Sequence, residues 1–125
     1  MSSNSSTEEE AVQALLKGHK FYCDRNYTAA IAEYTRALRL RNVSSWVRIC
    51  TLINRAGARE RIGGTENLEL ALQDARAMIQ RFKDQPEGYS CAARIHQLLD
   101  DDKSALDVLK YGIKQMKPES LQLEV

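Results

Sequence analysis

The chain has 125 residues, the length of one domain, and its charged residues balance to a formal net charge of +1. This near-neutral balance gives no electrostatic reason to expect a nucleic-acid-binding or membrane-surface protein. The first ten residues have neither the basic nor the apolar region of a secretion signal, and the chain has no run of 18 apolar residues. We therefore expect a cytoplasmic or nuclear protein.

The first half of the chain carries start signals for three helices. Thr7 and Glu10 form a T-x-x-E capping box, which predicts that the first helix begins at Thr7 and follows a disordered tail. Asn26 precedes a second apolar-periodic stretch, and Ser44 or Ser45 is the expected N-cap of the third. The tail covers residues 1–6, and these helices are expected at about 7–23, 27–40 and 45–62.

The second half divides in the same way. The adjacent Gly63 and Gly64 end the third helix, because two glycines cost about 2 kcal/mol inside a helix. A fourth helix is expected at about 66–82. Pro86 opens the fifth, and Asp100, Asp101 and Asp102 lie at the turn before the sixth, which Pro118 closes.

A period of about 34 residues runs through these helices. The first unit matches the pattern G-x2-Y…A-x3-F-x2-A at Gly18, Phe21, Ala30, Tyr34 and Ala37. The third unit repeats it at Tyr89, Ala93, Ala105, Leu109 and Gly112. The second is anchored by 54–56 and 71–75, with a lengthened turn between its helices.

On these residues the chain resembles the tetratricopeptide repeat family over about residues 11–118. The resemblance implies an all-α superhelix of three stacked antiparallel helical hairpins. The repeats would cover about 11–44, 45–85 and 86–118, and 119–125 would be the start of a capping helix or a tail. Small residues should lie where paired helices approach most closely, with larger side chains filling the space beside them. The larger side chains expected in this core are Phe21, Tyr27, Tyr34, Tyr89 and Leu109.

The sequence gives no sign of catalysis, a metal site or a bound cofactor, and we expect a protein that is not an enzyme. His19 and His96 lack a motif that would make either one a general base. Gly63 and Gly64 follow a helix and lack the G-K-[ST] of a phosphate loop. Three cysteines without a C-x-x-C pair argue against a disulfide framework or zinc, and the acidic run at 100–102 lacks calcium-loop spacing.

A stack of this kind offers its first helices to a partner protein. Exposed first-helix positions predict a groove, of which Leu16 and Ile53 have an even chance of being core instead. Arg61 and Arg94 are expected to hold a partner carboxylate, unless Arg61 only complements the helix dipole. The expected partner is an acidic or partly apolar segment. The predicted groove residues are His19, Tyr22, Asn54, Arg61, Arg94 and Gln97.

Three kinds of partner remain open. In the tetratricopeptide family the acidic tail of heat-shock chaperones binds a carboxylate clamp, and of the matching positions 15, 19, 54, 87 and 91 only Asn54 agrees. Seven arginines with Trp46 in the stretch 36–61 allow, less favourably, a nucleic-acid scaffold.

The segments 54–56, 70–79 and 88–113 look like the N-terminal repeats of fungal F-box proteins with leucine-rich repeats. That resemblance implies a tether that docks an SCF ubiquitin ligase onto replication machinery at chromatin, in the nucleus. Independently of the partner, the face of the last two helices should remain partly apolar and allow weak self-association.

Overall fold

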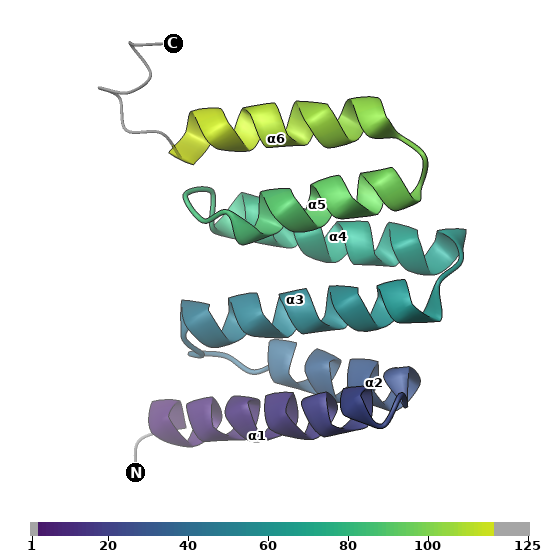
Figure 1. Cartoon of the computed structure of the whole chain (residues 1–125). Helices are drawn as coiled ribbons and strands as arrows, with labels where there is room; N and C mark the ends of the chain where they lie inside the picture. The colour runs from purple at the N-terminus through teal and green to yellow at the C-terminus, as the bar shows by residue number, and fades with distance from the viewer. Residues whose placement is uncertain (1–2, 117–125) are drawn as a thin grey trace.

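The computed structural model describes the backbone from residue 3 to residue 116 and the side chains from residue 7 onward. Six α-helices follow one another without a strand in this part of the chain. Their bounds are α1 Ser3–Cys23, α2 Tyr27–Leu38, α3 Ser45–Ile62, α4 Thr65–Arg81, α5 Glu87–Leu98 and α6 Asp102–Met116 (Figure 1). The expected all-α class is confirmed.

Side-chain caps explain where three of the helices begin. The Asn26 side chain accepts a hydrogen bond from the Ala29 amide at 3.3 Å, and α2 starts after it. Ser44 caps α3 in the same way, accepting from Val47 at 3.3 Å. Asp101 accepts from the Ser104 amide at 3.1 Å before α6, and hydrogen bonding from the Ser104 side chain and amide holds the pKa of Asp101 below its usual value.

The N-terminal boundary differs from the expectation. Helix α1 begins at Ser3, so Thr7 and Glu10 lie inside it, and they do not form its first capping box. Glu8 instead accepts two hydrogen bonds from Ser44, at 2.8 Å to the amide and 2.9 Å to the hydroxyl, and ties the start of α1 to the α2–α3 turn. The predicted stop at Pro118 and the capping segment 119–125 lie outside the described residues.

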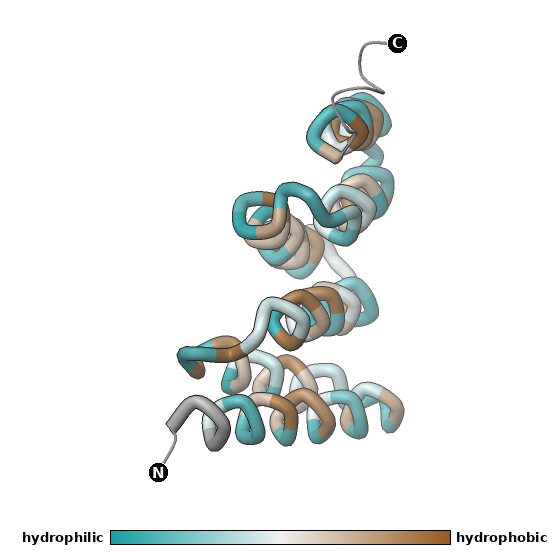
Figure 2. Tube along the Cα trace, turned by 90° about the vertical axis from the view of Figure 1, so that its left-hand side faces the viewer, coloured by the Kyte–Doolittle hydropathy of each residue, from teal (hydrophilic) through white to brown (hydrophobic). Residues whose placement is uncertain are grey.

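The helices pack in chain order as antiparallel neighbours, consistent with stacked hairpins. Figure 2, which looks along α3 to α6, shows hydrophobic and hydrophilic residues on different sides of the helices. In addition α1 contacts α3, and α3 contacts α5, so these first helices form one continuous side of the stack. In Figure 1, α4 lies behind α5.

Close approach between paired helices depends on glycine. A Cβ atom at Gly18 would lie 2.5 Å from the ring of Tyr34, and one at Gly112 would lie 2.6 Å from the ring of Tyr89. Both tyrosine rings are fully buried. The expected packing of small against large residues is therefore present in the first and third hairpins.

Some expected core residues are less buried than the repeat pattern implies. Phe21 and Tyr27 are half-buried and pack against the buried residues Ala30, Tyr34 and Ala58. Leu109 is 40% exposed, because α6 has no described helix against its outer side. Leu16 is 57% exposed and does not belong to the core, whereas Ile53 is half-buried and packs against the main core cluster.

A charged network lies between α3 and α4. Asp74 is 2% exposed and accepts hydrogen bonds from Arg55 at 2.6 Å and from Arg59 at 2.9 Å. Arg55 also donates to the Thr35 hydroxyl at 3.1 Å, and Arg59 donates to the Leu70 carbonyl at 3.2 Å. Burial lowers the pKa of Arg59, against the attraction of Asp74. The network joins α2, α3 and α4.

Candidate functional site

Two adjoining hollows mark the side formed by α1, α3 and α5. The first has a volume of about 210 Å³, and it is lined by His19, Tyr22, Tyr34, Ile53, Asn54, Gly57 and Arg94. The second has a volume of about 230 Å³, and it is lined by Ile53, Pro86, Glu87, Ser90, Cys91 and Arg94. Ile53 and Arg94 line both hollows, so the two hollows adjoin, and together they are called the groove below.

Helical spacing explains why α3 supplies the floor of the groove. Ile53 and Gly57 are four residues apart, so they lie on the same face of α3. Gly57 leaves open space above α3, because a Cβ atom there would have only the Tyr22 hydroxyl within 4 Å, at 3.9 Å. The groove therefore has room for a side chain above Gly57.

The structure brings four of the six predicted residues together. His19, Tyr22, Asn54 and Arg94 line the first hollow. Arg61 lies beside it, because its Nε donates to the Tyr22 hydroxyl at 3.1 Å. Gln97 is exposed and lines neither hollow of the groove.

Arg94 already has a carboxylate partner within the chain. Its guanidinium donates to both oxygens of Glu60, at 2.8 Å each, and this hydrogen bonding raises the pKa of Arg94. The bidentate pair joins α3 to α5 and neutralises the charge that was expected to attract a partner. The neighbouring Cys91 thiol is buried, and its burial raises its pKa to about 11.

Arg61 has a role beyond that of a helix-terminal cation. The hydrogen bond to the Tyr22 hydroxyl raises the pKa of Arg61 and connects the end of α3 with α1. The Tyr22 ring in turn meets the ring of Tyr27 edge to face, with centroids 5.3 Å apart. Arg61 thus orders one wall of the groove and remains exposed.

Two buried oxygens in the groove lack hydrogen-bond partners. Among the described residues, the unpartnered buried side-chain atoms are the Tyr34 hydroxyl and Glu87 Oε1. Tyr34 lines the first hollow and Glu87 the second. Buried polar atoms are nearly always hydrogen-bonded in folded proteins, and both residues that depart from this rule line the groove.

Sequence reasoning did not single out either oxygen as a binding group. Tyr34 was expected in the core, and its ring is there, but a one-letter pattern does not reveal whether its hydroxyl finds a partner. Glu87 was expected at an exposed first-helix position of the groove, and it was also weighed against a carboxylate clamp, for which its charge has the wrong sign. Trp46 lines neither hollow, but it lies four, seven and eleven residues before Cys50, Ile53 and Gly57, which places it on the same face of α3 as the groove.

The arginine-rich stretch 36–61 is largely engaged within the fold. Arg48 donates to the Leu38 and Leu40 carbonyls, at 3.4 and 2.7 Å. Arg36 pairs with Glu33 at 3.3 Å. Together with Arg55, Arg59 and Arg61, five of the seven arginines have intramolecular partners.

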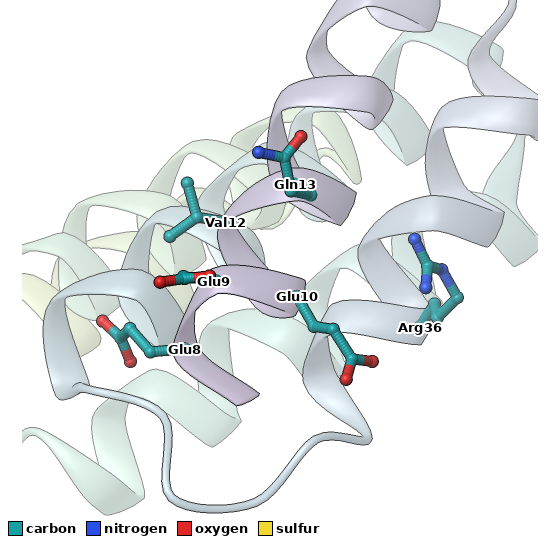
Figure 3. A pocket seen from close by; sticks show the side chains of 6 residues that line it. All are labelled: Glu8, Glu9, Glu10, Val12, Gln13 and Arg36. Atoms are coloured by element: carbon teal, nitrogen blue, oxygen red, sulfur yellow. The ribbon is translucent and has the colours of Figure 1, made fainter. Parts of the chain in front are cut away.

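A separate hollow of about 460 Å³ lies near the start of α1 and contains Glu8, Glu9 and Glu10. Figure 3 shows that the Glu8 and Glu9 side chains point away from Arg36, while Glu10 is directed toward the side of α2. Because the carboxylates diverge, they do not converge on a common ligand position. Among the described residues, no group of three His, Cys, Asp or Glu side chains is placed to hold a metal ion.

The searches for relatives leave the family open. No family model matches the chain. No curated protein sequence matches it either. In the described part of the chain, none of the helices is both long and apolar enough to cross a membrane.

Proposed function

We propose that this chain is a protein-interaction module that holds a segment of a partner protein in the groove. The observation that carries the proposal is the continuity of the two hollows, which share Ile53 and Arg94 and draw their lining from several helices. Two adjoining hollows beside successive first helices suit a peptide or a helix better than a compact metabolite. No catalytic role is proposed for any residue.

Membership of the tetratricopeptide repeat family is part of this proposal. It is supported by the six stacked helices and by the close contacts of Tyr34 with Gly18 and of Tyr89 with Gly112. A tether for an SCF ubiquitin ligase is the most specific form of the proposed role. It rests on the resemblance of the segments quoted above, and an F-box encoded downstream of this segment would support it.

The two alternative partners find less support in the geometry. A chaperone tail needs several cations or amides converging on carboxylates, whereas the groove contains Glu87 and an Arg94 already paired with Glu60. A nucleic acid needs free cations, and most arginines of the stretch 36–61 bond within the protein. Both remain less favoured proposals.

The groove is tested by filling it. Peptides of 12 residues selected from a random display library against the 125-residue chain are titrated calorimetrically against the unaltered chain and the Gly57→Leu variant. Leucine at this position fills the room above Gly57 and favours helix, so the fold should survive. We expect at least about tenfold weaker binding, equivalent to about 1.4 kcal/mol.

The matched control is Gln73→Leu, which adds the same side chain at an exposed position of α4 outside the groove. Binding should be unchanged in this variant. Equal weakening by both substitutions, or selected peptides indifferent to Gly57→Leu, would place binding elsewhere. Circular dichroism of both variants establishes that helix content is retained.

A further inference from the structure

The two unpartnered oxygens and an exposed tryptophan define what the groove can recognise. This inference rests on the proposed function, because it concerns the partner that the same groove would hold. Trp46 is 70% exposed, the highest exposed fraction among the large hydrophobic residues that the structure describes. Its spacing from Cys50, Ile53 and Gly57 places it on the groove face of α3, at the N-terminal end of the helix.

Trp46 provides an apolar anchor point on the groove face of α3. Its side chain is exposed and does not stabilise the fold by burial, but its large rigid ring provides extensive contact area to a partner. Tryptophan is among the residues that most often dominate the energetics of an interface. From Trp46 to Ile53, where the hollows meet, α3 rises by about 10 Å.

Glu87 gives the second hollow its chemical preference. Glu87 Oε1 is buried without a hydrogen-bond partner in the described part of the chain. The carboxylate lies close to α3, since its charge contributes, after burial, to the raised pKa of Cys50. The nearest cation of the same hollow, Arg94, is held by Glu60 at 2.8 Å. The described residues that line this hollow thus leave the Glu87 carboxylate without a counter-charge.

The first hollow also contains an atom without a hydrogen-bond partner, but there the atom is uncharged. The Tyr34 hydroxyl is buried, unpartnered among the described residues, and lies beside Asn54 and His19. Because Tyr34 is fully buried, a bound segment would reach this hydroxyl only through a bridging water molecule. The groove therefore combines an acceptor at Glu87 with a neutral polar position at Tyr34, and Trp46 lies beyond its lining on the same face of α3.

We propose that the groove binds a basic, partly apolar protein segment, which places an apolar side chain on Trp46 and a lysine or arginine on Glu87. This partner differs from the acidic segment expected from the arginines alone. The reason is that Glu60 neutralises Arg94, whereas the described residues offer Glu87 no counter-charge. A charge-assisted hydrogen bond to the Glu87 carboxylate would supply that counter-charge.

The test uses the peptides selected from the 12-residue library and the Glu87→Gln variant. We expect lysine or arginine to be enriched among the peptides whose binding Gly57→Leu prevents. The Glu87→Gln variant should bind these peptides about tenfold or more weakly than the unaltered chain. Asp84→Asn is the matched control, because Asp84 is exposed just before α5 and should leave affinity unchanged. Replacing the peptide lysine by norleucine should remove the effect of Glu87→Gln, which completes a double-mutant cycle.

Trp46 reports on the other end of the groove. It is the one tryptophan of the chain, so the intrinsic emission measures its environment directly. Binding should shift this emission to shorter wavelength, and Trp46→Ala should weaken binding about tenfold or more. Leu106→Ala is the matched control, since it shortens an exposed apolar side chain on α6.

The outcomes separate the partner class from the groove itself. Acidic peptides that compete for the groove, or basic peptides indifferent to Glu87→Gln, would overturn this inference and leave the proposed function standing. An unchanged Trp46 emission on binding would overturn the apolar anchor. If no selected peptide depends on Gly57, the proposed function fails together with the inference.

Discussion

Gly18 and Gly57 show how the same residue serves opposite purposes inside helices of this protein. At Gly18 the missing side chain lets α1 approach the Tyr34 ring of α2, and a Cβ atom there would lie 2.5 Å from that ring. At Gly57 the missing side chain leaves open space in the groove. The first glycine is therefore needed for the fold, and the second is needed for the shape of the groove.

Alanine at these two positions should change stability in opposite directions. Gly57→Ala should raise the free energy of unfolding by about 0.5–1 kcal/mol, because alanine favours helix. Gly18→Ala should lower it by about 1–3 kcal/mol, because the buried Tyr34 ring must move. Urea denaturation of both variants measures the two signs. Stabilisation by Gly18→Ala would show that the hairpin accommodates a methyl group at this contact.

Cys91 gives the protein a pH-dependent stability in alkaline solution. Burial, partly offset by Arg94, raises the pKa of its thiol from 9.0 to about 11. The unfolded chain then releases this proton before the folded chain does, so stability falls as pH rises from 9 toward 11. The expected slope is at most about 1.4 kcal/mol per pH unit.

Replacing the thiol tests this source of the slope. The stability of Cys91→Ala should depend less on pH between 9 and 10 than that of the unaltered chain. This window lies below the pH range in which the buried Tyr34, with a pKa raised to about 12, contributes most. Thermal melts of both proteins at a series of pH values provide the comparison. An identical slope for the variant and the unaltered chain would assign the pH dependence to other groups.

Among the elements, α3 and α4 depend on the charged network around Asp74. Removing this carboxylate leaves Arg55 and Arg59 half-buried without their counter-charge. Breaking a buried ion pair on one side costs about 3–5 kcal/mol, so Asp74→Ala should lower the free energy of unfolding by that amount. Urea denaturation measures the loss.

The control for Asp74 is Asp107→Ala on the exposed side of α6. This substitution should change the free energy of unfolding by no more than about 0.5 kcal/mol. Near-equal losses in the two variants would mean that Arg55 and Arg59 find other partners after the carboxylate is removed. Retained helix content in Asp74→Ala at low temperature keeps the comparison meaningful.

The six helices could be predicted because their boundaries are local. Asn26 and Ser44 cap the helices that follow them, and the glycine pair ends α3 where expected. The predicted start of α1 was wrong, because the sequence T-x-x-E also occurs inside helices and does not by itself mark where a helix starts. Intervals of three and four residues also identified which side chains share a face.

The pairing of charges in the groove could not be predicted in the same way. The bonds from Arg94 to Glu60 and from Arg61 to Tyr22 join residues 34 and 39 positions apart. Whether a cation is free for a ligand depends on such contacts between helices, which spacing within one helix does not contain. The same holds for Glu87, whose lack of a partner depends on α3 and α5 together.

At the scale of the whole molecule, the stack leaves an apolar stripe on α6. Leu106, Leu109 and Ile113 follow one another at intervals of three and four residues, and their exposed fractions are 53%, 40% and 51%. These intervals place them on one face of the helix, at the opposite end of the stack from α1 (Figure 1). Neighbouring exposed apolar side chains favour association when the protein is concentrated.

We therefore expect weak self-association through α6. Sedimentation velocity should show species larger than a monomer as the concentration approaches the millimolar range, since burying the stripe against a second copy removes apolar surface from water. The double variant Leu106→Lys with Ile113→Lys should restore the monomer, because like charges would face each other across the contact. Leu16→Lys, at a 57% exposed position on α1, is the control and should associate like the unaltered chain. A strict monomer at millimolar concentration, or equal association of all three proteins, would show that α6 is not the contact.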